Sequence, residues 1–221
     1  MGSSRWQVTT TTRLGIKEVL SLGLLLVEMP VFENRTRMFV KERVSLLKLR
    51  DTYDLLEVES LGSVGLAKDE PATWAKWARL LAKKALLPTT LNVYADNHPQ
   101  PQLSIHKRPG IFCTRLEIRD AHGQLLVQVI SKVFTLGGAL VIQDAGRQPI
   151  GELTGDWKGW DYTATLRGEA IGRVTKKWAG LAKELFTNAD QYLVEASQPQ
   201  HFRLVLGLAL AVDLVYKERQ G

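Results

Sequence analysis

The sequence predicts a mainly β fold: a closed antiparallel barrel with an apolar helix in its interior and one inserted amphipathic helix. Strand-like segments separated by turns follow one another through most of the chain, and a unit of two strands recurs about every 23 residues. A meander of paired strands leaves two open edges unless it closes on itself, so we expect a barrel. The last apolar segment is too short for a membrane span and belongs in the barrel's interior.

Short runs of apolar and β-branched residues predict the individual strands. Turn residues end these runs, among them Asp120-Ala121-His122-Gly123 and Gly137-Gly138, so successive strands are expected to form hairpins. The strand segments are residues 39–49, 53–58, 64–67, 116–119, 125–134, 139–142 and 150–153.

A short motif follows several of the turns: an apolar residue, a small residue, a variable residue and a second apolar residue. It reads Ile150-Gly151-Glu152-Leu153, Ile171-Gly172-Arg173-Val174 and Val64-Gly65-Leu66-Ala67. Leu126-Val127-Gln128-Val129 and Leu103-Ser104-Ile105 occupy equivalent places after their own turns. The regular spacing indicates a series of two-stranded units.

One interval between these units is about 16 residues longer than the others, and a helix is predicted there, from Pro71 to Leu87. One arc of this helix is apolar and the opposite arc is basic. The helix either lies on an anionic membrane or covers the barrel with its apolar face while its charged face is solvated. The residues expected to contact a membrane are Trp74, Lys76, Trp77, Arg79, Lys83 and Lys84.

The apolar segment from Phe202 to Tyr216 predicts a helix buried in protein. About 15 residues at about 1.5 Å each give about 22 Å, against a hydrocarbon core of about 30 Å. Arg203 and Asp213 would also have to be accommodated in the lipid. Packing inside the barrel avoids both the mismatch in length and the burial of these two charges in lipid.

Composition limits the class of protein. The chain has 221 residues, 45% hydrophobic and 24% charged, which fits one globular domain with its own core. The single cysteine, Cys113, favours a reducing, cytoplasmic setting. Lysine and arginine outnumber the acidic residues 29 to 23, and the net charge of +6 favours anionic partners. The apolar stretch at residues 19–27 is expected to pack rather than to act as a signal, because no cleavage site follows it.

No enzymatic activity is predicted. Cys113 lies in a strand-like context without an adjacent acid–base pair, and the four histidines are scattered along the chain. Gly137-Gly138 precedes a strand, not the helix of a phosphate-binding loop. Trp157 and Trp160 could stack on a ligand, but packing in the core or at the barrel rim is the preferred interpretation. Nucleic acid is not an expected partner, because the basic residues do not alternate with exposed aromatic residues along strands.

Two segments near the C-terminus, residues 171–181 (IGRVTKKWAGL) and 183–192 (KELFTNADQY), resemble the signature of phospholipid scramblase-related proteins. Residues 49–54 and 156–162 resemble the same family and its plant LURP-one-related group. The resemblance implies a tubby-like fold, a barrel of about twelve strands around a hydrophobic C-terminal helix. It covers residues 31–221 and leaves residues 1–30 as an N-terminal extension. The signature residues are Trp178, Gly180, Phe186, Asp190, Tyr192 and Asp213.

In animal scramblases, a calcium-binding segment precedes the closing helix, and it corresponds here to Asn188 through Pro199. The resemblance implies calcium ligands at Asp190 and Asn188. Calcium prefers six to eight oxygen ligands with several carboxylates, yet Asn188 is neutral and Pro199 stands where the closing acid would be. The alternative is that Asp190 braces a turn and that the protein needs no cofactor.

Two functions remain open at this stage. The family resemblance implies a protein that binds anionic phospholipid at a membrane surface and helps phospholipids cross the bilayer. Its contacts would be the inserted helix and the basic pairs Lys107-Arg108 and Lys176-Lys177. The LURP-one-related likeness instead implies a soluble scaffold that binds a ligand or a protein without lipid transport. The sequence identifies no protein partner.

Overall fold

The protein is described from a computed structural model, in which residues 32, 34–43, 51–70, 87–108, 113–132, 139–156, 159–176 and 191–220 are well enough placed for description. These residues belong to one compact unit, Phe32–Gly221. The inserted helix at residues 71–87 falls almost entirely outside the described residues. The domain boundary expected after residue 30 stays a prediction.

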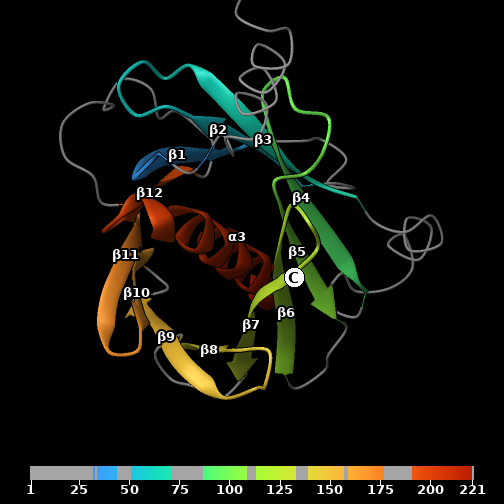
Figure 1. Ribbon diagram of the computed structural model, residues 1–221, viewed down its shortest axis with the longest axis vertical. Helices are drawn as coiled ribbons and strands as arrows, with labels where there is room; N and C mark the ends of the chain where they lie inside the picture. Colours follow the sequence, from blue (N-terminus) through green and yellow to red (C-terminus); the bar gives the residue numbers. More distant parts are fainter. Residues whose placement is uncertain are drawn as a thin grey trace, which may run out of the picture. The chain divides into compact units, whose positions relative to one another are not determined.

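Twelve strands form a closed antiparallel barrel within the described residues, as predicted (Figure 1). Each strand pairs with its neighbours in sequence, and the barrel closes where the first strand pairs with the last. The strands are β1 (Arg37–Glu42), β2 (Thr52–Leu56), β3 (Ser63–Asp69), β4 (Thr89–Ala95), β5 (Leu103–Arg108), β6 (Cys113–Asp120), β7 (Leu125–Lys132), β8 (Leu140–Gln143), β9 (Pro149–Asp156), β10 (Asp161–Leu166), β11 (Glu169–Thr175) and β12 (Gln191–Ala196).

The repeated glycines of the sequence motif occupy equivalent places in the barrel. Gly65, Gly151 and Gly172 each pair with the last residue before a β-bulge on the preceding strand. A Cβ atom at any of them would lie closer to a carbonyl oxygen of the following strand than real side chains come. The motif therefore marks points where three strands approach closely and bend, which helps the sheet to close.

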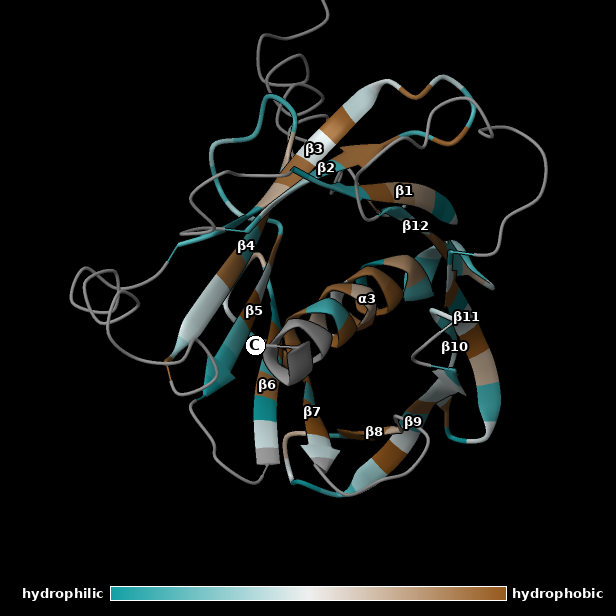
Figure 2. Cartoon of the chain, turned by 180° about the vertical axis from the view of Figure 1, so that it is seen from behind, coloured by the Kyte–Doolittle hydropathy of each residue, from teal (hydrophilic) through white to brown (hydrophobic). Residues whose placement is uncertain are grey.

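The helix α3 (Pro199–Gln220) lies inside the barrel, where it packs against β5, β6, β7, β11 and β12 (Figure 1). Residues 205–215 are buried on every side, and Figure 2 shows hydrophobic residues along the middle of the helix. Gly207 permits the close approach: a Cβ atom there would lie 2.8 Å from Cγ2 of Ile118. The predicted destination of the apolar segment is confirmed.

The helix is longer than expected. It contains 22 residues, because the polar residues on both sides of the apolar segment continue it. The length of about 22 Å expected from the sequence applies to the apolar segment from Phe202 to Tyr216 and not to the whole helix. Among the described residues, no helix combines enough length with enough apolarity to cross a membrane.

Buried polar side chains gather at one end of the barrel, the polar end. Odd-numbered strands from β3 to β7 finish there and even-numbered strands begin there. Asp213 of α3 joins this end, where its carboxylate accepts a hydrogen bond from the hydroxyl of Tyr53. In the described part of the chain, the inward-facing polar residues at this end include Tyr53, Asp69, Thr89, Lys107, Thr114, Ser131 and Tyr192.

Candidate functional site

Two rows of outward-facing side chains cross the strands β5 to β8. The first row consists of His106, Glu117, Gln128 and Gln143, which the backbone register places opposite one another. The second row consists of Arg108, Arg115 and Ile130. The row between them points inward and is buried; it consists of Lys107, Leu116 and Val129. Side chains alternate between the two faces of a sheet, so both outer rows face away from the interior.

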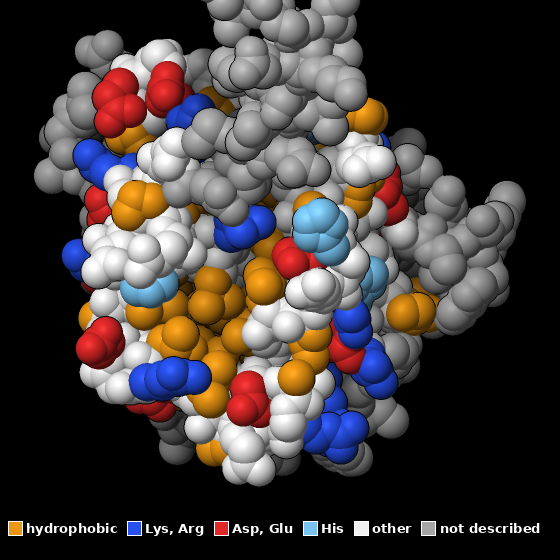
Figure 3. All heavy atoms as spheres, in the orientation of Figure 1, with side chains coloured by type: hydrophobic (Ala, Val, Ile, Leu, Met, Phe, Trp, Pro, Cys, Tyr) orange, Lys and Arg blue, Asp and Glu red, His pale blue; other side chains and the backbone are white. Residues whose placement is uncertain are grey.

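A groove of about 220 Å³ lies between these rows. Three arginines and one glutamate line it, which gives a formal charge of +2. Figure 3 shows basic side chains gathered at the lower right of the view, over β5 and β6. The lining residues are Arg108, Arg115, Leu116, Glu117, Gln128, Ile130, Gln143 and Arg147. We call this site the arginine groove.

Arg147 reaches the arginine groove from the turn between β8 and β9. The carboxylate of Asp144 accepts a hydrogen bond from the backbone N–H of Gln148 at 2.9 Å, and the backbone N–H of Arg147 donates to the Asp144 carbonyl at 3.0 Å. Arg147 has a φ of 63°, a left-handed conformation that hairpin turns use. The turn therefore fixes the backbone of the third arginine beside the groove.

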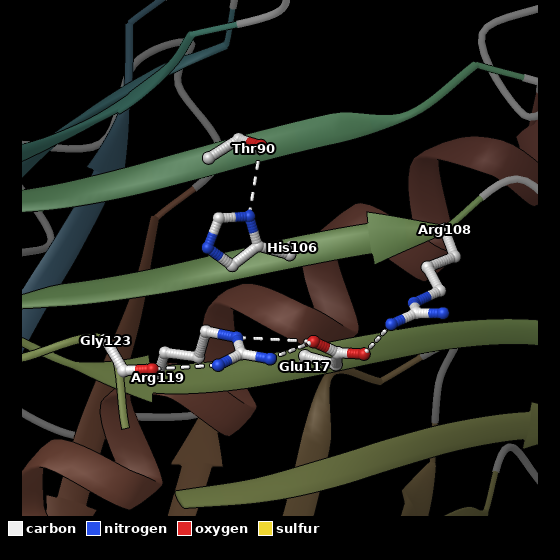
Figure 4. Close-up of polar contacts among 6 residues, drawn as sticks. All are labelled: Thr90, His106, Arg108, Glu117, Arg119 and Gly123. Atoms are coloured by element: carbon white, nitrogen blue, oxygen red, sulfur yellow. Dashed lines mark hydrogen bonds and ion pairs between the residues drawn. The ribbon is translucent and has the colours of Figure 1, made fainter. Parts of the chain in front are cut away.

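Glu117 is held between two arginines (Figure 4). Its carboxylate accepts hydrogen bonds from Nη2 of Arg108 at 2.5 Å and from Nη2 of Arg119 at 2.7 Å. Arg119 also donates to the carbonyl oxygen of Gly123 at 2.8 Å. These contacts hold the pKa of Glu117 below its usual value, chiefly through the hydrogen bond from Arg119, while burial opposes the shift. Glu117 is therefore ionised near neutral pH.

His106 lies beside this network, with Nδ1 3.3 Å from the hydroxyl oxygen of Thr90 (Figure 4). Its pKa is lowered, first by burial and then by the positive charge of Arg119, and the charge of Glu117 only partly offsets this. His106 is thus mostly neutral near pH 7 and adds no full positive charge beside the groove.

The arginine groove has the chemistry of an anion site. Guanidinium groups match the geometry of phosphate and carboxylate, to which they donate paired hydrogen bonds. In the described part of the chain, neither Arg115 nor Arg147 forms an ion pair. The amides of Gln128 and Gln143 supply neutral donors on the facing row.

Most of the sequence-predicted site residues lie outside the described residues. They are the membrane-contact set Trp74, Lys76, Trp77, Arg79, Lys83 and Lys84, the signature residues Trp178, Gly180 and Phe186, and the proposed calcium ligands Asn188 and Asp190. Among the described residues, no group of three or more His, Cys, Asp or Glu side chains could hold a metal ion. The calcium interpretation stays a prediction.

The two signature residues that are described lie in the interior and not at the arginine groove. Asp213 is bonded to Tyr53 at the polar end. Tyr192 is fully buried, and its ring stacks on Trp160 with the ring centroids 5.2 Å apart. Trp160 is also buried, which agrees with packing rather than with an exposed stacking platform.

One of the predicted basic pairs is divided by the barrel wall. Arg108 is exposed at the arginine groove, whereas Lys107 points into the polar end and is 4% exposed, so its expected surface role is wrong. Neighbouring residues of a strand face opposite sides, and a pair of basic residues in a strand therefore supplies one surface charge. Lys176 is half-buried, with Nζ 4.3 Å from the centroid of the Trp160 ring.

Sequence reasoning missed Arg115, Glu117 and Arg147 as site residues. Strand alternation would have placed Arg115 and Glu117 on one face of their strand. It would not have shown which residues of the neighbouring strands lie opposite them.

Residues 148–219 match the family model described as Scramblase. The match spans the part of the barrel from β9 to β12 and most of α3. The residues that line the arginine groove precede it in the sequence. No solved structure matches the chain.

Proposed function

We propose that this scramblase-related chain is a non-enzymatic protein that binds anionic phospholipid at a membrane surface. The observation that carries the proposal is the arginine groove on the outer wall of the barrel. It gathers Arg108, Arg115 and Arg147 from three separate segments onto one exposed face. The match to the Scramblase family model supports an interaction with lipid. The net charge of +6 also favours binding to anionic membranes.

Surface binding needs only modest energy from each contact. A lysine or arginine near an anionic membrane contributes about 1 kcal/mol, so three arginines together contribute about 3 kcal/mol. Such binding weakens as salt is added, because the Debye length falls to about 10 Å at 0.1 M ionic strength. Contact of this kind is reversible. The protein is proposed to be cytoplasmic and to make this reversible contact with the membrane.

Contact at the outer wall is a simpler proposal than lipid transport through the barrel. Residues 205–215 of α3 occupy the interior, and the buried hydrogen bond between Tyr53 and Asp213 joins the helix to the wall. Assistance to transbilayer lipid movement would require the helix to leave this environment. That step would expose the apolar surface of α3 and break the buried polar contact.

A vesicle sedimentation experiment tests the proposal. The protein is expected to sediment with phosphatidylcholine vesicles that contain phosphatidylserine at low salt, and to be released at high salt. Replacing Arg108, Arg115 and Arg147 together by glutamine is expected to weaken this association by about 100-fold or more at low salt, because about 1 kcal/mol is lost at each position.

The matched control removes the same charge elsewhere on the barrel. Arg37, Arg43 and Arg173 are exposed and form surface ion pairs away from the groove. Exposed ion pairs contribute little to stability, so this triple glutamine variant should fold. Equal loss of binding in both variants would show that net charge, not the groove, determines association. Absence of any vesicle binding at low salt would contradict the proposal.

The polar groups of the groove favour a second candidate, a soluble binding module without lipid chemistry. Gln128 and Gln143 line the site with neutral donors and acceptors, which a purely electrostatic contact with a membrane does not need. A chain that ignores anionic vesicles but binds a soluble anion at the same arginines would establish this second function.

A further inference from the structure

We propose that the barrel docks on an anionic bilayer along β7, with Leu126 and Ile130 entering between the lipid headgroups while the arginines of the groove bind phosphates. This docking mode rests on the membrane role proposed above. It adds to that role an orientation of the barrel and an apolar contribution to binding. Charge alone supplies neither, because electrostatic attraction acts over a distance and in many orientations.

The outer face of β7 carries large aliphatic side chains. Val127 and Val129 are buried on the inner face, and side chains alternate along a strand, so the residues between and beside them face outward. These outward-facing residues are Leu126, Gln128 and Ile130. Leu126 is 36% exposed, and it is the one large hydrophobic residue in the described part of the chain that is exposed to this degree. Ile130 is half-buried.

Positive charges lie on both sides of these aliphatic residues. The register places Ile130 opposite Arg115 of β6 on one side and opposite Val141 of β8 on the other. Arg147 reaches the arginine groove from the turn that follows β8. An apolar strip between cations is complementary to an anionic bilayer, because lipid phosphates attract the arginines and the boundary of the acyl chains accepts the aliphatic side chains.

Leu126 favours a bilayer over a small soluble anion as the occupant of this face. It does not line the arginine groove, so an anion bound in the groove would leave it exposed to water. A bilayer is wide enough to cover Leu126 and Ile130 together. Four residues of a strand span about 13 Å, at about 3.3 Å for each residue.

The curvature of the barrel also favours contact at this strand. A barrel wall is convex and neighbouring strands are about 4.8 Å apart, so only a few strands can touch a flat surface together. The strands β6, β7 and β8 are consecutive in the wall (Figure 1). If Arg115 and Arg147 both contact phosphates, β7 and β8 between them come nearest to the membrane. The longer arginine side chains do not prevent this approach, because their aliphatic stems lie along apolar neighbours while the guanidinium groups stay among the phosphates.

An acidic side chain marks where the docking face ends. Glu152 of β9 is exposed and lies opposite Val141 in the register. An anionic bilayer repels this carboxylate, whereas it attracts the arginines on β5 and β6. The barrel is therefore expected to tilt on β7 towards β6 and away from β9.

A fluorescent label tests this orientation directly. Cys113 is the single cysteine of the chain, so Leu126→Cys in a Cys113→Ser chain accepts one nitrobenzoxadiazole label, whose emission rises when it leaves water. The emission at position 126 is expected to rise on addition of phosphatidylcholine vesicles that contain phosphatidylserine. Leu66→Cys is the matched control, because Leu66 is a half-buried leucine on the outer face of β3, and its label should stay in water. An equal rise at both positions, or none at position 126 in a chain that sediments with the vesicles, would overturn the proposed docking.

Removal of the aliphatic side chains tests their contribution to binding. Threonine is β-branched and suits a strand, so Leu126→Thr and Ile130→Thr together should keep β7 intact. This double variant is expected to bind the same vesicles about tenfold more weakly, a loss of about 1.4 kcal/mol. The factor should be the same at low and at moderate salt, because salt does not screen apolar contacts, whereas the effect of replacing the arginines should shrink as salt is added. Leu66→Thr should leave binding unchanged, and a double variant that binds like the wild type would contradict the apolar contribution.

A tryptophan substitution tests the same contact by a gain of affinity and does not depend on the threonine variant. Tryptophan favours the membrane interface, so Leu126→Trp is expected to raise the affinity for the vesicles by at least about threefold. Leu66→Trp should have no such effect. Unchanged or weaker binding by a folded Leu126→Trp chain would overturn the docking of β7.

The outcomes separate this docking mode from the membrane role itself. Failure of the wild-type chain to sediment with the vesicles at low salt would reject both. Sedimentation that the arginine replacements weaken, without a response of the label at position 126 or of the threonine and tryptophan variants, would reject docking along β7 and leave the membrane role standing.

Discussion

Replacing Tyr53 by phenylalanine is expected to lower the free energy of unfolding by about 1.5–3 kcal/mol, the usual contribution of a buried hydrogen bond to a charged group. Tyr53 is fully buried and donates to the carboxylate of Asp213, which is 2% exposed. The two residues are 160 positions apart and join β2 to α3. Urea denaturation monitored by circular dichroism measures the loss.

Tyr94→Phe is the matched control. The hydroxyl of Tyr94 also donates to a carboxylate, that of Glu70 at 2.9 Å, but this contact is exposed. Its removal should cost under about 1 kcal/mol, because water replaces the lost partner. Equal destabilisation by the two variants would show that the buried hydrogen bond between Tyr53 and Asp213 contributes no more to stability than the exposed one between Tyr94 and Glu70.

Tyr53 should also make the fold sensitive to alkaline pH. Its pKa is raised well above the usual value, first because burial disfavours the phenolate and then because of the negative charges of Asp213 and Asp51. The folded-state pKa therefore exceeds the unfolded value of about 10. The stability that this group contributes is complete below about pH 10 and falls as the pH rises above it. The Tyr53→Phe chain should lose less stability than the wild type between about pH 10 and 12, and a parallel loss would contradict the assignment.

The barrel and its central helix were predictable because both depend on local patterns. Alternating burial along β5, with Leu103 and Ile105 inside, follows from the period of a strand. Glycine recurs at positions 151 and 172 because at each of them a neighbouring strand comes too close for a side chain. The extent of α3 was underestimated, since hydropathy marks the buried part of a helix and not its polar ends.

The arginine groove was not predictable in the same way. Its residues come from four strands and one turn, and only the register brings Arg108 opposite Arg115. A shift of one residue between β5 and β6 would place a different pair of side chains together. The sequence did suggest basic contact points, but it counted Lys107 and Arg108 as one surface pair, and the strand divides them between the interior and the solvent.

Replacing Gly172 by alanine is expected to destabilise the barrel by about 1–3 kcal/mol, the usual cost of overpacking. A Cβ atom at this position would lie 2.5 Å from the carbonyl oxygen of Glu195 on β12 and 2.7 Å from Cγ2 of Val205 on α3. Gly172 therefore lies at a point where β11, β12 and the central helix approach one another closely. Glycine to alanine changes often stabilise a protein, by up to about 1 kcal/mol, because they restrict the unfolded chain. A loss of stability in Gly172→Ala would therefore show that the added Cβ atom clashes with its neighbours.

Val205 provides the decisive comparison for Gly172→Ala. Val205→Ala alone should destabilise the chain by leaving a small cavity. In the double variant, the space left by the valine methyl groups accommodates part of the new Cβ atom, so the total loss should be smaller than the sum of the two single losses by at least about 0.5 kcal/mol. Gly146→Ala, where the added atom would lie 3.3 Å from the Asp144 carboxylate and near no backbone atom of another strand, is the control and should change stability little. Strictly additive losses would mean that α3 does not press on β11 at this point, and the helix would then be less firmly packed in the barrel than its burial indicates.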